Sequence, residues 1–557
     1  MNTSFETPTR EDARMNASIE FTGNEPPVPL LTPLFGQAAL KPKMLAMHTL
    51  ITGMTGSGKT QSALLPLATS LLQYRLPGCA ATGGLVIDPK GELLQKLRSV
   101  PSLCDRIRVI GEDGVRFNAF EFEPQLSVFD RLSILRGMVD DSMGVSTDSA
   151  HWRAMGWDFV CKLYEAHAAL SEKGMDFFGR MYAILGTRRR MHDIRMISII
   201  EETAHAGSVV AVSEQDETSD SRKNESRMDQ DIVDKINLVK GSCSLRKFAL
   251  FLNELGASGD NIKTTSTTLS RLIQRHRLNC TNPLEKFSFD SDLHRQLTYF
   301  AQAIGPQLTQ LSDPALGDLV ALDPLGNSGQ IGTVSLAMML DAGYIVLYQP
   351  RQFSENADGL MATVLRVLFQ KYITRRANLQ QPLVYVCDEF HRYVNCDEQY
   401  GDDVFLSFCR SYRVMACLCT QSMAALQTAI AHKKSPGLAE YATRALLNNC
   451  GNRLWFRTID PQTQLDVRAV YPFQESHSRP HILDVRPLAK LETGTAYFLT
   501  ADGREGRERI TLLSSGALEP NRKAESESER YLSGKSNGAK RADRVRSVKE
   551  EHTTMLA

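Results

Sequence analysis

The sequence predicts an α/β fold in which one sheet domain is interrupted by a helical domain. From "MHTLI" to "RVIGEDGVRFNAF", short apolar runs alternate with helical stretches, as in a parallel sheet. Strand-like runs are then scarce across residues 149–324, where helical periodicity dominates. Short strands, each preceded by a helical segment, resume in "GYIVLYQP", "PLVYVCDEF", "VMACLCTQ", "NRLWFRT" and "TAYFL". The sheet domain is therefore expected to comprise residues 46–148 and 325–515.

The remaining segments are polar. Residues 1–45 end in "GNEPPVPLLTPL", whose prolines oppose helix and suggest an extended arm. Within the helical domain, the charged stretch "SEQDETSDSRKNESRMDQD" predicts a mobile loop near residues 205–235. Residues 516–557 have few apolar positions, so we expect a disordered tail.

The composition is that of an ordinary globular chain. Among 557 residues, 64 Lys and Arg balance 64 Asp and Glu, so net charge does not argue for a nucleic-acid or membrane partner. Eleven cysteines without a CxxC pair indicate a reduced, cytoplasmic compartment. His477 and His481 lack accompanying cysteines or acids and are interpreted as loop residues rather than metal ligands. No apolar run approaches the ~20 residues that cross a bilayer.

The stretch "ITGMTGSGKTQS" predicts a nucleotide site. It matches GxxxxGK[ST] and lies between the apolar run "HTLIT" and the helical run "QSALLPLATSLL". In this context backbone N–H groups turn inward on phosphates at a helix N-terminus. Lys59 would then reach the β- and γ-phosphates of ATP, and Thr60 would hold Mg²⁺. The predicted nucleotide-binding residues are Gly53, Thr55, Gly56, Ser57, Gly58, Lys59, Thr60 and Gln61.

A second site segment follows the apolar strand in "PLVYVCDEF". Asp388 and Glu389 emerge at its carboxyl end, where α/β sheets bind ligands. Asp388 is placed to contact the Mg²⁺ shell, and Glu389 to polarise a water for attack on the γ-phosphate. The alternative is surface polarity at a strand end, which the upstream phosphate loop disfavours.

Two further polar residues accompany the strand in "VMACLCTQS". Gln421, at its end, can hydrogen-bond the attacking water or the γ-phosphate, or it can simply face solvent. Arg410, in "SFCRSYR", is expected near the carboxyl edge of the sheet, where a guanidinium stabilises transition-state charge in a neighbouring subunit. From the residues alone, a surface arginine is the favoured interpretation of Arg410.

Together these blocks carry a family resemblance. The ordered set GMTGSGKT, DPKGEL, CDEF, CRSYRVMACLCTQS and NNCGNRLWFRTIDPQT resembles the type IV coupling proteins of bacterial conjugation and secretion, the TraG/TraD-type ATPases. "RFNAF" followed by "HWRAMGWDFV" resembles that family's entry from sheet to helical domain. The resemblance covers most of residues 46–515.

The resemblance implies a RecA-like P-loop NTPase domain with an inserted all-α domain. It implies a homo-oligomeric ring, usually hexameric, that uses ATP to deliver single-stranded DNA, a relaxase or another protein to a membrane secretion channel. Lys59 and Thr60 become the phosphate-loop pair, and Asp388 and Glu389 the second carboxylate motif. The family roles carried over to the remaining residues are a sensor at Gln421 and a trans-acting arginine at Arg410. The Asp88, Pro89, Lys90 and Gly91 block matches the family without an assigned chemical role.

Two departures from the family bear on location and size. Its members usually begin with two transmembrane helices, whereas the chain before Gly53 is polar or broken by prolines. We therefore expect a cytoplasmic protein, or one peripheral at the inner membrane, that reaches a channel through a separate membrane protein. The long interval from Lys59 to Asp388 predicts an enlarged helical insert.

The mode of action stays open between two classes. Basic clusters in "TRRRMHDIR" and "RLIQRHRLN" suit DNA phosphates, although such runs are also solvated helix faces. A motor would use these clusters to bind DNA. Its substrate would be single-stranded DNA or, alternatively, duplex DNA. A nucleotide-gated receptor would instead recruit relaxase or effector proteins without moving DNA. The clustered residues are Arg188, Arg189, Arg190 and Arg195, then Arg271, Arg275 and Arg277.

Overall fold

The computed structural model describes residues 20–111, 150–190, 245–285, 295–299, 336–350, 355–396, 401–470 and 486–510, apart from single positions within these ranges. Two compact units divide the chain. The first comprises Met1–Arg108, Ala337–Pro350 and Phe369–Ala557, and the second Val109–Leu336 and Arg351–Leu368. The second unit thus extends past the predicted boundaries 149–324. The predicted mobile loop, the predicted tail and the two histidines of "HSRPH" lie outside the described residues.

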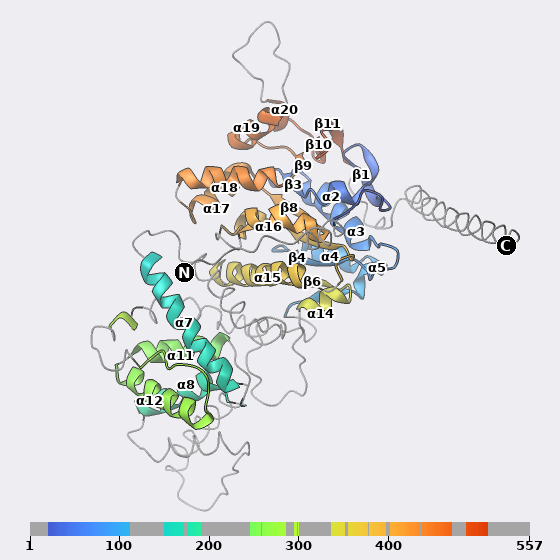
Figure 1. Cartoon of the computed structure of the whole chain (residues 1–557). Helices are drawn as coiled ribbons and strands as arrows, with labels where there is room; N and C mark the ends of the chain where they lie inside the picture. The colour runs from blue at the N-terminus through green and yellow to red at the C-terminus, as the bar shows by residue number, and fades with distance from the viewer. Residues whose placement is uncertain are drawn as a thin grey trace, which may run out of the picture. The chain divides into compact units, whose positions relative to one another are not determined.

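The first unit is built on a nine-stranded sheet (Figure 1). Its strand order is β11-β10-β9-β3-β8-β7-β4-β6-β5, and the central pairs from β9 to β6 are parallel. The bounds are β3 (Thr49–Thr52), β4 (Gly83–Ile87), β5 (Ile107–Val109), β6 (Ile345–Tyr348), β7 (Leu383–Cys387), β8 (Val414–Thr420), β9 (Asn452–Trp455), β10 (Thr495–Leu499) and β11 (Glu505–Arg509). This arrangement confirms the predicted α/β class.

Burial explains why some strands have continuous apolar sequences and β11 has an alternating, charged one. Every residue of β7 and β8 is buried, as expected for parallel strands that are covered on both faces and therefore read as continuous apolar runs. Strand β11 instead alternates exposed charged residues with half-buried ones. It pairs antiparallel with β10 at the edge of the sheet, where charge disfavours pairing with another chain.

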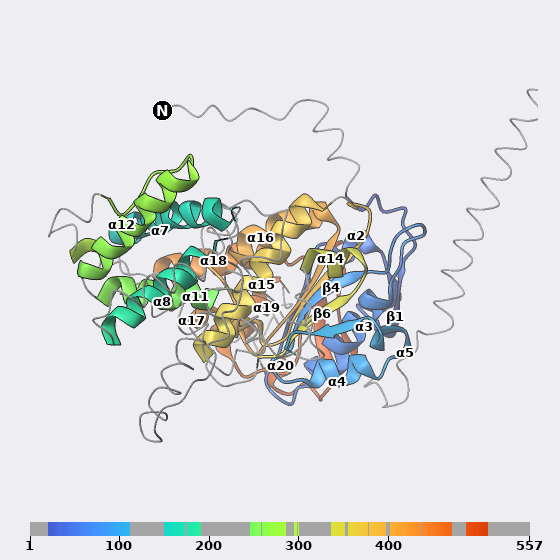
Figure 2. The same cartoon turned by 90° about the horizontal axis from the view of Figure 1, so that it is seen from below.

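Helices cover both faces of this sheet. Helix α3 packs on β7 and β8, and α16 and α17 also contact β8. Figure 2 shows α3 and α16 on opposite sides of the strands. The helix bounds in this unit are α3 (Leu65–Gln73), α4 (Glu92–Arg98), α5 (Pro101–Cys104), α14 (Leu336–Asp341), α16 (Asp402–Cys409), α17 (Met423–Ala431), α18 (Pro436–Asn448), α19 (Pro461–Val470) and α20 (Arg486–Ala489), while α15 (Glu355–Arg375) runs across the unit boundary.

The N-terminal segment is more structured than the sequence suggests. Strands β1 (Val28–Leu34) and β2 (Gln37–Leu40) form an antiparallel hairpin, followed by the short helix α2 (Pro42–Leu45). The Leu31 N–H donates to the Ser70 hydroxyl of α3 at 3.0 Å. Prolines are tolerated because the hairpin register is irregular between the two ends of β1. Apolar side chains of β1 are buried, so residues 28–45 form a packed hairpin and a short helix rather than the predicted extended arm, whose residues 1–19 lie outside the described part of the chain.

In the second unit, the described elements between residues 150 and 276 are all helices. An aromatic cluster lies among them, and it includes a stacked pair, His167 and Phe178, with ring centroids 4.1 Å apart. Phe159 and Leu163, expected on one helix face, are both buried. The helices are α7 (Ala150–Ser171), α8 (Phe177–Arg190), α11 (Leu245–Ala257) and α12 (Gly259–His276).

A buried histidine lies at the amino end of β3. The His48 Nε2–H donates to the Leu406 carbonyl at 3.0 Å, and Nδ1 accepts from the Ala416 N–H at 3.3 Å. Cys409 also contacts the ring. Burial, with a smaller contribution from the charge of Arg410, lowers the pKa of His48 to about 4 against the raising effect of the Leu406 hydrogen bond. The imidazole is therefore neutral at pH 7.

We predict that His48 makes the free energy of unfolding pH-dependent. The unfolded chain binds a proton near the ordinary pKa of 6.5, but the folded chain does so only near 4. Stability therefore falls as pH decreases between these values, by about 3 kcal/mol at most. Urea unfolding at pH 7, 6, 5 and 4.5 should show a smaller loss for His48→Asn, which tolerates the positive φ of this position. Equal losses in both chains would contradict the assignment.

Candidate nucleotide site

The strand order brings four polar segments together at the carboxyl ends of the parallel strands, which we call the carboxyl edge of the sheet. Strands β3, β8, β7 and β4 are consecutive neighbours and parallel, with spacings of about 4.8 Å. Their carboxyl ends carry, in the same order, the phosphate loop, Gln421, the pair Asp388 and Glu389, and the turn that begins at Asp88. Such an edge is where open α/β sheets bind ligands.

The phosphate loop connects β3 to a π-helical turn, η1 (Thr60–Leu64), which continues into α3. Gly56 and Gly58 have φ values of 75° and 91°, which residues with a Cβ rarely adopt. A Cβ on Gly53 would lie 2.6 Å from the Cβ of Phe456. The glycines are therefore required by backbone conformation at two positions and by close packing at the third.

The loop presents donors that no described residue satisfies. Lys59 is 4% exposed, and its ammonium makes no hydrogen bond or ion pair within the described part of the chain. The backbone N–H groups of Gly56 and Gly58 likewise have no acceptor there. The Ser57 hydroxyl is buried without a partner among the same residues. Because a buried ammonium requires an anionic partner, the loop fits the phosphates of a nucleotide.

Asp388 is buried at the end of β7. Its Oδ1 accepts from the Glu389 N–H at 2.9 Å, whereas Oδ2 accepts no N–H or O–H bond from the described residues. Burial raises the pKa of Asp388 against the lowering effect of Lys90, and the charge of Glu389 raises it further. The Cys419 thiol also forms a hydrogen bond with the Asp388 carboxylate, which lowers its pKa. A buried carboxylate oxygen that accepts no N–H or O–H from the described residues fits a cation such as Mg²⁺, with the hydroxyl of Thr60 as the second protein ligand.

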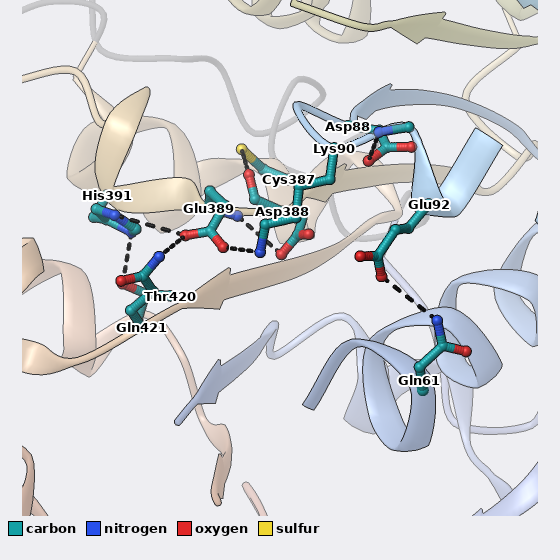
Figure 3. Close-up of polar contacts among 11 residues, drawn as sticks. Gln61, Asp88, Lys90, Glu92, Cys387, Asp388, Glu389, His391, Thr420 and Gln421 are labelled. Atoms are coloured by element: carbon teal, nitrogen blue, oxygen red, sulfur yellow. Dashed lines mark hydrogen bonds and ion pairs between the residues drawn. The ribbon is translucent and has the colours of Figure 1, made fainter. Parts of the chain in front are cut away.

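Glu389 is 2% exposed and its φ is 50°, a conformation uncommon outside glycine. Its Oε1 forms an ion pair with the Lys90 ammonium, and its Oε2 accepts from Gln421 Nε2 at 2.9 Å (Figure 3). His391 Nε2 lies 3.7 Å from the same Oε2. Burial would raise the pKa of Glu389, but the hydrogen bond and charge of Lys90, with the charges of Lys59 and His391, lower it below its ordinary value.

The turn after β4 gives the DPKG block a structural role. The Asp88 carboxylate accepts from the Gly91 N–H at 3.0 Å and from the Leu94 N–H at 2.8 Å, which fixes the start of α4. Burial raises the pKa of Asp88 to about 6, opposed by the Leu94 hydrogen bond and reinforced by the charge of Asp388. Lys90 projects from this turn to Glu389. The sequence motifs do not predict a role for Lys90 or His391. The pairing of β4 with β7 brings Lys90 to Glu389, and this pairing and the contact of His391 with Glu389 become visible only in the structure.

Arg410 is not where the sequence analysis expected it. It begins the short helix η6 (Arg410–Tyr412) directly before β8, so it lies at the amino edge of the sheet and not at the carboxyl edge. Its Nη2 is 3.8 Å from Glu20 Oε1, and its side chain is 45% exposed. The earlier placement failed because the residue precedes its strand, whereas the site residues follow theirs. Arg410 therefore cannot serve the phosphate loop of its own chain.

Three further properties of the described residues concern the predicted Gln61 contact, metal clusters and membrane spans. Gln61 Nε2 lies 3.5 Å from Glu92 Oε2, which links η1 to α4. No group of three His, Cys, Asp or Glu side chains able to hold a metal is found in the ranges that the structure describes. Within the same ranges, every helix is too short or too polar to cross a bilayer.

Comparison with known proteins identifies the fold. No family model and no curated protein matches the chain. The plasmid coupling protein TrwB in complex with the ATP analogue ADPNP is 12% identical over 90% of this chain and 92% of its own, with a TM-score of 0.52. TrwB with the GTP analogue GDPNP and the conjugative coupling protein TrwBdeltaN70 with sulphate are each 13% identical over the same shares, with TM-scores of 0.50. The likeness to type IV coupling proteins that the sequence motifs indicate therefore holds for the fold of the chain.

Proposed function

We propose that this chain is a Mg²⁺-dependent ATPase of the coupling-protein type. The observation that supports it most is that two features occur at the same carboxyl edge of the sheet. Lys59 is buried and makes no hydrogen bond or ion pair with the described residues, and the second carboxylate motif follows β7, which is separated from β3 by β8. A phosphate loop alone is shared by kinases, GTPases and motors. Two adjacent carboxylates suit hydrolysis rather than transfer to a small acceptor. One of them has an oxygen that accepts no N–H or O–H from the described residues, and the other accepts from Gln421.

Each residue then has one task. Lys59 and the loop N–H groups bind the β- and γ-phosphates, while Thr60 and Asp388 hold Mg²⁺, which neutralises charge on the phosphate oxygens. Glu389 accepts a proton from the attacking water. Gln421 contacts Glu389 and is placed to orient that water or to sense the γ-phosphate.

The work coupled to hydrolysis is proposed to be transfer of DNA, or of a nucleoprotein such as a relaxase bound to its strand, to a type IV secretion or conjugation channel. The fold likeness to proteins described as conjugative coupling proteins supports this. We propose a cytoplasmic homo-oligomeric ring that reaches the channel through a separate membrane protein. On α12, exposed basic side chains provide a surface for phosphates, and these are Arg271, Arg275 and, just past the helix end, Arg277.

ATP turnover measured with and without DNA tests this proposal. We expect hydrolysis that requires Mg²⁺ and rises with single-stranded DNA. Replacing Arg271, Arg275 and Arg277 by Gln should remove the stimulation and leave basal turnover unchanged, because these residues lie in the other unit from the phosphate loop. Arg444→Gln, at an exposed arginine of α18, is the control.

The outcomes separate the remaining interpretations. A stronger response to duplex DNA would indicate a duplex translocase. Hydrolysis that no DNA stimulates, together with ATP-dependent binding of relaxase, would indicate a receptor. The absence of Mg²⁺-dependent hydrolysis by the purified, assembled chain would contradict the proposed ATPase.

A further inference from the structure

We propose that Lys90 is a positioning residue that holds the Glu389 carboxylate in the orientation needed to accept a proton from the attacking water. This rests on the proposed ATPase function and adds a role for the DPKG turn. Lys90 lies on the strand end next to that of Glu389, and its ammonium pairs with Glu389 Oε1. No such role follows from the motif itself, which only places Lys90 near the phosphate loop.

The two lysines of the site have different environments. Lys59 is buried and makes no hydrogen bond or ion pair with the described residues, so it is available to a phosphate. The Lys90 side chain is 34% exposed and is already engaged by a carboxylate. An ammonium that is held by Glu389 adds little to phosphate binding while the pair persists. The structure therefore assigns binding to Lys59 and control of the carboxylate to Lys90.

The carboxylate is held from both sides of its strand. Gln421 follows β8 and donates to Oε2, and Lys90 follows β4 and pairs with Oε1. Strand β7, which ends just before Asp388 and Glu389, lies between these two strands. A carboxylate with one donor on each oxygen has a defined plane, yet it keeps lone pairs for a water. His391, at 3.7 Å, and Lys59 are further neighbours that affect Glu389, and the adjacent Asp388 carries a like charge.

The turn that carries Lys90 is itself fixed. Asp88 is buried and accepts two backbone N–H groups, from Gly91 and Leu94. Gly91 has a φ of 72°, and a Cβ there would lie 2.6 Å from the Gln349 amide nitrogen. The base of the lysine side chain is therefore held by two hydrogen bonds and a glycine-specific conformation. This makes the turn a rigid support for the ion pair rather than a passive loop.

Substitutions of Lys90 show whether it orients the Glu389 carboxylate or only stabilises the fold. Lys90→Gln should lower kcat about 10- to 100-fold, because the carboxylate loses its cationic partner on Oε1 and the shorter, neutral amide cannot replace the ion pair. KM for ATP should change less than about threefold, since Lys59 still binds the phosphates. Lys90→Arg, which restores a cationic donor, should recover much of the lost kcat. Lys96→Gln, the same substitution on α4 but away from Glu389, should match the parent chain.

A double substitution gives a second readout. If Lys90 acts only through Glu389, Lys90→Gln in the Glu389→Gln background should reduce turnover no further. Three results would each overturn the proposal. They are additive losses of turnover in the double variant, a loss of kcat/KM in Lys90→Gln that comes entirely from a higher KM, and no recovery of kcat in Lys90→Arg. So would unchanged or increased turnover in Lys90→Gln. Tryptophan fluorescence and nucleotide binding of each variant show whether it is folded.

Different variants show whether the ATPase function or only the role of Lys90 is wrong. If the parent does not hydrolyse ATP, or if Glu389→Gln hydrolyses it at the parental rate, then the ATPase assignment or the role of Glu389 is wrong, and the role of Lys90 is overturned with it. If both behave as expected and only the Lys90 variants do not, the positioning role alone is wrong.

Discussion

Glu389→Gln is expected to bind ATP as the parent chain does but to hydrolyse it about 10²- to 10⁴-fold more slowly. The substitution keeps the size of the side chain and its capacity to accept from Gln421, and it removes the ionised oxygen that takes the water's proton. Single-turnover hydrolysis and equilibrium binding of a fluorescent ATP analogue measure the two steps separately. Parental turnover in this variant would exclude Glu389 as the base.

Lys59→Ala provides the complementary result. Its ammonium is the buried cation of the phosphate loop, so we expect loss of nucleotide binding together with hydrolysis. The two variants therefore differ in binding although both are inactive. Lys43→Ala, a surface lysine on the short helix α2, is the control and should behave as the parent chain. Retention of ATP binding by Lys59→Ala at parental affinity would contradict the assignment of the loop.

The α/β class was predictable because its signal is local. Parallel strands that are buried on both faces produce apolar runs such as the one that ends at Cys387, and a polar residue at the carboxyl end marks the functional edge. The signal of the phosphate loop is also local, since its glycines and Lys59 all lie within residues 53–59. The N-terminal hairpin was missed because prolines were interpreted as evidence against regular structure, whereas its irregular register accommodates them.

The contacts around Glu389 were not predictable, because they depend on strand order. Lys90 and Glu389 are far apart in the sequence and meet only because β4 and β7 are adjacent. The same applies to Gln421, whose contact with Glu389 requires β8 to lie beside β7. Arg410 shows the converse error. It was placed by its proximity in sequence to Gln421, but the whole length of β8 separates the two residues, and they lie at opposite edges of the sheet.

The position of Arg410 leads to the second large effect that we expect. Arg410 lies at the amino ends of the parallel strands, away from the phosphate loop of its own chain, and its side chain is 45% exposed. We propose that it stabilises transition-state charge in the site of a neighbour. Arg410→Ala should then lower turnover by about three to five orders of magnitude while ATP still binds. Arg444→Ala, at a more exposed arginine, should have no effect.

Mixing two inactive variants tests whether the site is shared. A Lys59→Ala subunit can still donate Arg410, and an Arg410→Ala subunit can still bind ATP, so interfaces that combine an intact loop with an intact arginine should hydrolyse ATP. Because each of the two single variants loses so much ATP turnover, even a small fraction of such interfaces gives a measurable rate. Assembly of the mixture must be confirmed by light scattering, since monomers cannot complement one another. If the assembled mixture stays as inactive as its components, or if Arg410→Ala alone keeps full activity, Arg410 has no role in the neighbouring site and its exposure is that of an ordinary surface arginine.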